Sequence, residues 1–327
     1  MRKKGKNILN VVLSLTLGGA ILYWMYRGFD FNRVCDVLVH EMRWEWMLLS
    51  FPFGILAQTI RAWRWRQTLE PVSEQSRVLT RVHSIFLSYA ASLVIPRIGE
   101  FARCGILKRY DNVSFSKALG TVVTERAIDS LVVLGIAALT FLLQFRVFMT
   151  FFSETGTSLD AIFHRFTMAG WLVTLVCALA IGVLGWYLAK GRMKELFSGI
   201  WQGIVSLRNV KNVPLFIFYT LAIWLSYFLH YYLTFFCFDA TAGLGMMCAL
   251  VTFIVGSIAV IVPTPNGAGP WHFAVKTMLI LYGVTDQDAL YFVLIVHSVQ
   301  TLLVVSLGIY AWIALTFTAR RQEKTIN

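Results

Sequence analysis

Apolar residues in this chain gather into blocks of roughly 17–25 residues, the length that an α-helix needs to cross a hydrocarbon core of about 30 Å. Six of these blocks run without interruption. They lie at about 8–26, 44–60, 127–145, 168–189, 213–238 and 289–317. Each block predicts one full membrane-spanning helix, and most charged residues fall in the segments between them.

Two further apolar segments, 78–112 and 246–284, are each divided by proline and glycine. The first runs through VIPRIGEFARCGILKRY and the second through VIVPTPNGAGPWHF. Proline removes a backbone donor and glycine disfavours a helix, so each break leaves backbone polar groups unpaired. Such groups are tolerated at membrane depth only inside protein or beside a polar cavity. We therefore expect two re-entrant helical hairpins.

The positions of lysine and arginine predict how the spans are oriented. With both termini in the cytoplasm and each hairpin returning to its own side, the cytoplasmic segments hold 20 Lys and Arg and the outer segments hold 5. Cytoplasmic loops generally carry this excess of positive charge. The predicted fold is all-α integral membrane, with six full transmembrane helices, two re-entrant hairpins, and N and C termini cytoplasmic at the cell membrane.

This orientation divides the chain into two membrane repeats. Residues 1–150 contain the inward-opening hairpin 78–112, and residues 160–327 contain the outward-opening hairpin 246–284. Each half makes three full crossings, so the second half starts from the opposite side and the two form an inverted repeat. Inverted repeats with broken helices at corresponding positions are typical of transporters, whose central sites lie at the breaks.

Composition supports a membrane protein and excludes several other classes. Charged residues make up 14% of the chain, whereas soluble domains carry about 25%. The net charge is +12, and most of the Lys and Arg residues that produce it lie between the apolar blocks, where they would contact lipid head groups. We therefore expect no nucleic-acid partner. The five cysteines form no CxxC pair and the six histidines no i, i+4 pair, which leaves no metal or disulfide motif.

The tip of the first hairpin holds Arg97, Glu100 and Arg103. Charged residues at membrane depth are costly and are generally functional. Glu100 is three residues from each arginine, so all three share a face if the segment is helical. One interpretation is a local ion-pair staple that closes the hairpin. The other is a positively charged binding site for a phosphate-bearing head group, in which Glu100 orients the guanidinium groups.

The tip of the second hairpin contains Asn266, Gly267, Gly269 and His272. The glycines suit a tight non-helical tip, and we expect the following helix to begin near Gly269–Pro270. The free N–H groups of that helix start form an anion site without a basic side chain. His272 falls in the first turn, where it is either a satisfied core histidine or a substrate contact.

Two further charged motifs flank the predicted spans. In ERAID at 125–129, Arg126 and Asp129 either pair with each other or lie against the first hairpin. In RAWRWRQTL at 61–69, Arg61 and Arg64 share a helix face at the predicted cytoplasmic boundary. They are interpreted either as interfacial anchors or as residues that capture a head group from the inner leaflet.

Together, RAWRWR at 61–66, PRIGEFAR at 96–103, ERAID at 125–129 and PTPNGAG at 263–269 resemble the lysylphosphatidylglycerol synthase transmembrane region and its flippase-like relatives. The resemblance extends over essentially the whole chain and implies lipid handling. Two features depart from the family pattern P-G-G-x-G-x-x-E. Asn266 replaces a glycine, and His272 occupies the position of the glutamate.

The expected function is translocation of a phospholipid, with an anionic or aminoacylated head group, between leaflets. We expect no enzyme activity, because the sequence has no HExxH, GxSxG or P-loop motif and the chain ends ten residues after the last predicted span. No cofactor is expected. Two alternatives remain: an integral-membrane enzyme or accessory subunit acting on polyprenyl or lipid phosphates, and a scaffold for a separate lipid-modifying enzyme.

Overall fold

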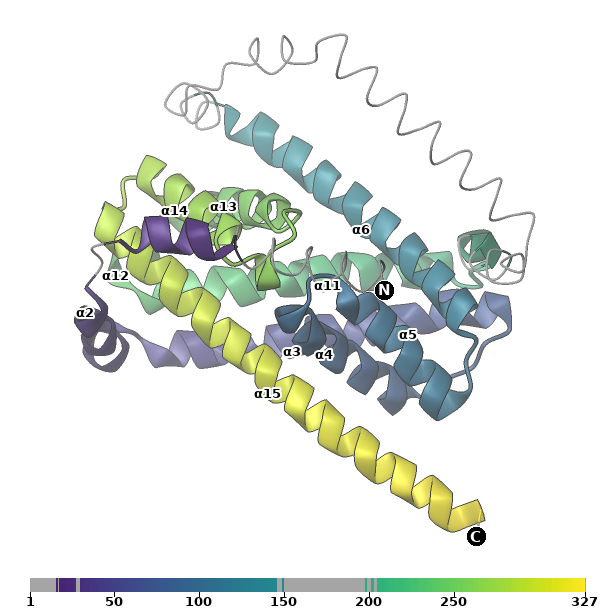
Figure 1. Ribbon diagram of the computed structural model, residues 1–327. Coiled ribbons are helices and arrows are strands. Elements are labelled where there is room, and N and C mark those ends of the chain that lie inside the picture. The colour runs from purple at the N-terminus through teal and green to yellow at the C-terminus, as the bar shows by residue number, and fades with distance from the viewer. Residues whose placement is uncertain are drawn as a thin grey trace.

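The computed structural model describes residues 18–27, 30–145 and 205–326, together with a few isolated positions. Within these ranges the chain is helical and contains no strand. The elements, in order, are α2 (Phe31–Asp36), η1 (Val37–Glu41), α3 (Trp44–Leu69), η2 (Glu70–Val72), α4 (Val78–Val94), α5 (Ile98–Asp111), α6 (Phe115–Leu143), η3 (Ser206–Asn209), α11 (Val213–Tyr232), η4 (Leu233–Cys237), α12 (Asp239–Ala242), α13 (Gly245–Ala259), η5 (Pro265–Gly267), α14 (Pro270–Leu281) and α15 (Asp286–Ile326). Figure 1 shows them as a bundle crossed by α15.

Helices α3 and α11 form an antiparallel pair at the centre of the bundle (Figure 1). His230 near the end of α11 lies 2.8 Å from the Ser50 carbonyl near the start of α3. At the opposite end, Arg64 donates to Thr220 at 3.2 Å. Helix α3 is 26 residues long, which corresponds to about 39 Å at 1.5 Å per residue. The predicted span 44–60 therefore continues nine residues further, through the arginine motif.

The predicted break in segment 78–112 is confirmed, with α4 ending at Val94 and α5 beginning at Ile98. The two helices fold back on each other, because Arg77 before α4 pairs with Asp111 at the end of α5 at 2.7 Å. The segment therefore returns to the end of the bundle from which it started. We call α4 and α5 the first hairpin.

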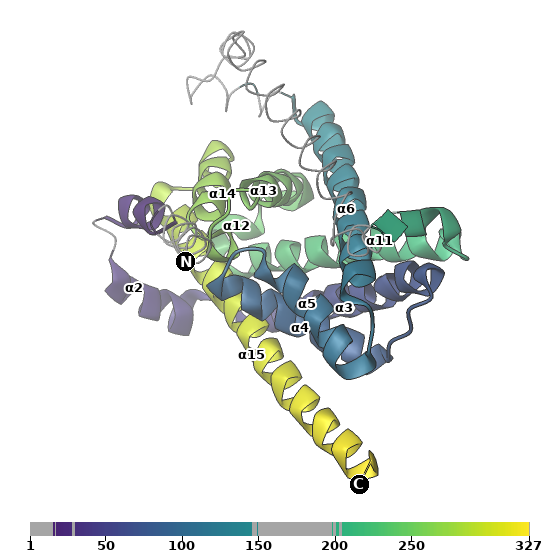
Figure 2. The ribbon, with the colours of Figure 1, turned by 45° about the vertical axis from the view of Figure 1, so that its right-hand side comes forward.

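The second predicted break is also confirmed. Helix α13 ends at Ala259, and α14 begins at Pro270, where the sequence places it. Gly256 of α13 faces the Trp271 and Val275 side chains of α14, so the two helices pack closely. Figures 1 and 2 both show them side by side. We call α13 and α14 the second hairpin.

The two hairpins start from opposite ends of α3 and meet at their tips. The base of the first hairpin lies near the end of α3, because Arg81 in the first turn of α4 donates to the Ala62 carbonyl of α3 at 3.2 Å. The base of the second shares an apolar core with Met47 in the first turns of α3. At the tips, the Arg97 guanidinium donates to the Ile261 carbonyl at 3.1 Å.

Helix α15 joins the two halves of the chain, because its Gly308 packs directly against Ala90 of the first hairpin. Helices α6, α11 with η4, and α15 up to Thr318 are long and apolar enough to cross a membrane, by length and composition and among the described residues. Helices α4 and α13 are apolar but shorter. The predicted span 168–189 lies outside the described residues, as does the first part of span 8–26.

Candidate functional site

A buried network of charged side chains connects α3 and α6 with the first hairpin. Its core is Asp129, one oxygen of which accepts a hydrogen bond from Arg61 at 2.6 Å. The other oxygen pairs with Arg64 at 2.8 Å. Arg61 and Arg64 are three residues apart, so both side chains leave α3 on the same face and reach one carboxylate.

Glu125 extends this network to the first hairpin. It lies one helical turn before Asp129 on α6 and pairs with Arg103 of α5 at 2.9 Å. Arg64 also lies 3.9 Å from its other oxygen. The side chains of Arg64 and Glu125 are both fully shielded from solvent. A buried charge is tolerated when it is paired, which explains why these residues lie together.

Aromatic and hydroxyl groups hold the arginines in place. The Arg103 guanidinium lies 4.5 Å from the centre of the Trp65 ring, a distance typical of a cation–π contact. The Trp65 indole donates to Thr121 at 2.9 Å, which fixes the ring between α3 and α6. The geometry of Arg103 is therefore set by three helices.

The outer part of the network is Arg126, whose side chain is 39% exposed. It pairs with Glu100 of α5 at 3.4 Å and with Asp129 at 3.3 Å. Arg126 of the ERAID motif therefore pairs with Asp129 and also lies against the first hairpin, so the two interpretations of this motif hold together. We define the ionic network as Arg61, Arg64, Glu100, Arg103, Glu125, Arg126 and Asp129.

The structure corrects two sequence interpretations. Glu100 does not staple the first hairpin by pairing with Arg97 or Arg103, because its partner is Arg126. Arg61 and Arg64 are not anchors at a membrane boundary, since both are buried and pair with Asp129 of α6. Sequence spacing identified the shared faces, but it did not indicate which distant helix supplies the partners.

A second region, the central cavity, lies between the two hairpins. It has a volume of about 300 Å³ and is bounded by α3, α4, α11, both helices of the second hairpin and α15. Polar side chains from six elements line it among apolar neighbours. They are Gln58, Tyr89, Tyr227, His230, Ser257, Asn266, His297, Gln300 and Thr301. Most concave ligand sites combine an apolar wall with a few polar groups in this way.

The central cavity adjoins the ionic network through a tyrosine pair. The Tyr89 and Tyr227 hydroxyls are 2.7 Å apart and link the first hairpin to α11. The Arg61 guanidinium lies 5.8 Å from the Tyr227 ring centre. A ligand in the cavity that contacts Tyr227 would therefore be separated from the buried Arg61 guanidinium only by the Tyr227 ring.

The tip of the second hairpin is fixed by hydrogen bonds to α15. Asn266 adopts a left-handed conformation with φ of 51°, and its amide donates to Thr301 at 2.7 Å. Its carbonyl lies 3.1 Å from His297 Nε2. Gly267 and Gly269 also have positive φ angles, as the sequence predicts for this tip.

His272 lies in the first turn of α14, as predicted, and is buried. Its ring centre is 4.5 Å from that of His297, and its Nδ1 is 3.4 Å from the Gly269 amide. His272 is therefore held behind the tip and does not line the central cavity. His297 occupies the lining position instead.

The predicted residues thus form two groups. Arg61, Arg64, Glu100, Arg103, Arg126 and Asp129 belong to the ionic network. Asn266, Gly267, Gly269 and His272 form the second tip, and Arg97 connects the first tip to it. Glu125 opens the ERAID motif but was not predicted as a site residue, and His297 and Thr301 were missed. A sequence signal for His297 and Thr301 was present, because both are polar residues within the otherwise apolar predicted span 289–317.

No group of three or more His, Cys, Asp or Glu side chains suited to a metal ion occurs among the described residues. Comparison with curated proteins and with solved structures gives no match. The family model of the lysylphosphatidylglycerol synthase TM region matches residues 11–308. With its apolar helices, hairpins and buried charges, this chain is a membrane protein that belongs to the family of the lysylphosphatidylglycerol synthase transmembrane region.

Proposed function

We propose that this protein moves a phospholipid between the two leaflets of a cell membrane. The observation that carries the proposal is the meeting of two broken-helix hairpins, which start from opposite ends of α3, beside a polar cavity. Unpaired backbone and polar side chains are expected at membrane depth only where they serve a cavity or a substrate. Family membership supports a role in lipid handling.

In this proposal the hairpins are re-entrant and belong to two inverted repeats, within 1–150 and 160–327. The first opens to the cytoplasm, where both termini also lie. Each tip contains a non-glycine residue with left-handed backbone, Arg97 with φ of 63° and Asn266 with φ of 51°. This similarity supports a correspondence between the two tips. Rocking of one repeat against the other would expose the cavity to each leaflet in turn.

The head group would contact the tips, and the acyl chains would remain in the bilayer. Arg97 is the exposed cation at the point where the tips meet. The start of α14 adds the positive end of a helix dipole. Arg103 cannot serve as a free phosphate ligand while it is buried against Glu125. The ionic network would instead hold α3, α6 and the first hairpin together during movement.

We also propose that the chain performs no lipid chemistry itself and needs no cofactor. The substrate would be a phospholipid with an anionic or aminoacylated head group, and a separate lipid-modifying enzyme would supply an aminoacylated form. An enzyme or accessory subunit acting on lipid phosphates remains the competing function. A single assay that reports both leaflet position and chemical identity of the lipid distinguishes the two.

The test uses proteoliposomes that contain fluorescent phosphatidylglycerol, lysyl-phosphatidylglycerol or phosphatidylcholine, with leaflet position measured by dithionite quenching. We expect the protein to move at least one of them faster than empty liposomes do. Arg97→Asn should slow the movement, because asparagine tolerates the left-handed backbone but lacks the charge. Lys108→Gln, on the exposed face at the far end of α5, is the matched control.

Three outcomes would contradict the proposal. They are movement no faster than in empty liposomes, an Arg97→Asn variant as active as wild type, and chemical conversion of the lipid seen by chromatography. The third would favour the enzyme.

A further inference from the structure

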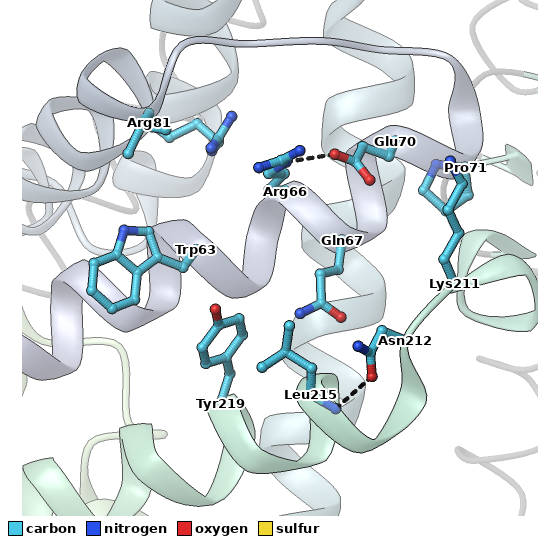
Figure 3. A pocket seen from close by; sticks show the side chains of 11 residues that line it. Trp63, Arg66, Gln67, Glu70, Pro71, Arg81, Lys211, Asn212, Leu215 and Tyr219 are labelled. Carbon is cyan, nitrogen blue, oxygen red and sulfur yellow. Dashed lines mark hydrogen bonds and ion pairs between the residues drawn. The ribbon is translucent and has the colours of Figure 1, made fainter.

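A second pocket lies at the opposite end of α3 from the second hairpin base and shares no residue with the central cavity. It has a volume of about 550 Å³ and lies between the end of α3, the start of α4 and the start of α11. We call it the basal pocket. Figure 3 shows side chains from all three helices surrounding one space.

The basal pocket contains more positive than negative charge. Arg66, Arg81 and Lys211 line it, together with a single carboxylate, Glu70. Glu70 already pairs with Arg66 at 2.5 Å, as drawn in Figure 3. Neither Arg81 nor Lys211 has an ion-pair partner within the described ranges. The start of α11 adds the positive end of a helix dipole at the same wall.

Arg81 is the most informative of these cations, because only 2% of its surface is exposed. Its guanidinium donates to the Ala62 carbonyl at 3.2 Å and to the Ser76 hydroxyl at 2.9 Å, and it also contacts the Ser76 carbonyl. All of these acceptors are neutral. A buried guanidinium generally has a carboxylate or another anion as its partner, and an anionic ligand would supply the partner that Arg81 lacks among the described residues.

Gln67 gives a second, independent indication of a ligand. Both polar atoms of its amide are buried, and neither has a hydrogen-bond partner among the described residues. Figure 3 shows this amide between Tyr219 and Asn212, within the ring of pocket residues. A buried amide without partners is costly, unless a ligand supplies them.

The remaining walls of the basal pocket are apolar and aromatic. Trp63 and Tyr219 have ring centres 6.2 Å apart, and Leu215 and Val78 lie beside them. Trp63 and Val78 are also exposed, so the pocket continues onto the apolar outer surface of the protein. Tryptophan and tyrosine are enriched at membrane interfaces. A free phosphate ion would leave these surfaces uncovered, whereas an amphipathic anion would cover them.

We infer that the basal pocket binds the phosphate head group of an anionic phospholipid, at a site separate from the central cavity. It lies at the end of the bundle that the charge pattern predicts to face the cytoplasm. The inference rests on the proposed function only in taking its ligand from the membrane. Lys211, Arg66 and Arg81 would contact the phosphodiester, Gln67 would bond to the head group, and Trp63 would lie against the first part of the lipid tails.

The experiment measures binding without transport. Full-length protein in an uncharged detergent is titrated by calorimetry with dihexanoyl phosphatidylglycerol, dihexanoyl phosphatidylcholine and inorganic phosphate. We expect saturable binding of phosphatidylglycerol and at least tenfold weaker binding of the other two. The double variant Arg66→Gln/Lys211→Gln should weaken phosphatidylglycerol binding about tenfold or more, because two charged contacts are lost.

Both substituted side chains are exposed, so the double variant should fold, which its melting curve checks. Lys108→Gln removes an exposed positive charge from α5 without touching the pocket and should bind as wild type does. Gln67→Leu keeps every charge and should weaken binding several-fold.

Unchanged affinity in the double variant would overturn the inference. Equal affinity for inorganic phosphate would overturn the lipid assignment in favour of a soluble phosphate, and equal affinity for phosphatidylcholine would overturn anion recognition. Because no transport is measured, failure here would leave the translocation proposal standing. A negative translocation assay would likewise leave this binding result intact.

Discussion

Replacing Asp129 with asparagine tests whether the ionic network holds α3, α6 and the first hairpin together. Asparagine preserves the shape of the side chain but removes its charge, which currently faces Arg61, Arg64 and Arg126 at 2.6, 2.8 and 3.3 Å. Among the described residues the network contains four guanidinium groups and three carboxylates, so it already has a net positive charge of one. The substitution raises that charge to two in a buried region.

The expected cost follows from the burial of the pair. Removing one partner of a buried ion pair costs about 3–5 kcal/mol, because the other charge remains without compensation. The same network predicts an asymmetry. Arg61→Gln brings the net charge to zero and leaves Asp129 with two other arginines, so it should destabilise the protein by less than Asp129→Asn does. A double-mutant cycle between the two positions should give a coupling energy above about 1 kcal/mol.

The assay is reversible unfolding in mixed micelles, followed by tryptophan fluorescence. Asp239→Asn is the matched control, because Asp239 pairs with Arg43 but is 84% exposed. An exposed pair contributes less than about 1 kcal/mol, so this variant should unfold nearly as wild type does. If Asp129→Asn is no less stable than Asp239→Asn, or if Arg61→Gln is the more destabilised variant, the network does not hold these helices together.

Three further predictions concern close backbone packing and one strained residue, all measured by the same unfolding assay. Gly99→Ala should destabilise the first hairpin by more than about 2 kcal/mol, since the new Cβ would lie 2.0 Å from a backbone oxygen of α4. The control is Gly105→Ala on the same helix, where the new Cβ meets nothing within 4 Å, so this variant should be neutral or stabilising. Equal stability of the two variants would show that α4 and α5 are not packed as described. Gly308→Ala should loosen α15 from α4, where its Cβ would come within 2.3 Å of another Cβ, and Gly135→Ala on the open side of α6 is the control. Asn266→Ala should be less stable than Asn266→Gly, because alanine is strained at a φ of 51°; the reverse order would argue against this tip conformation.

The sequence predicted the local breaks well, because their causes are local. Proline and glycine at 96–99 and 263–270 end one helix and start the next, and the structure has both breaks at these positions. The start of α14 at Pro270 followed from the preference of proline for the first turn. These features depend on backbone preferences within a few residues, so no tertiary information was needed.

The sequence did not predict which distant residues pair with one another, as Arg61 and Asp129 show. They are 68 positions apart, and interfacial arginines have the same local pattern as buried ones. A useful signal was nevertheless present, since two arginines on one face of α3 match two carboxylates one turn apart on α6. The lining of the central cavity was missed for a related reason. Gln58, Tyr227 and His297 are single polar residues in separate helices, and only the tertiary arrangement brings them together.

The central claim is that a lipid head group crosses between the two hairpin tips, and a reversible cross-link across them tests it most directly. Arg97 contacts the Ile261 carbonyl at this point, and the side chains of the neighbouring Ile98 and of Ile261 are exposed. Cysteines at Ile98 and Ile261, in a cysteine-free background that keeps Arg97, can be joined by a short, cleavable bifunctional reagent. Lipid movement is then measured in proteoliposomes before cross-linking, after it, and after cleavage. The account predicts that movement stops on cross-linking and returns on cleavage. Unchanged movement with the tips joined would contradict it.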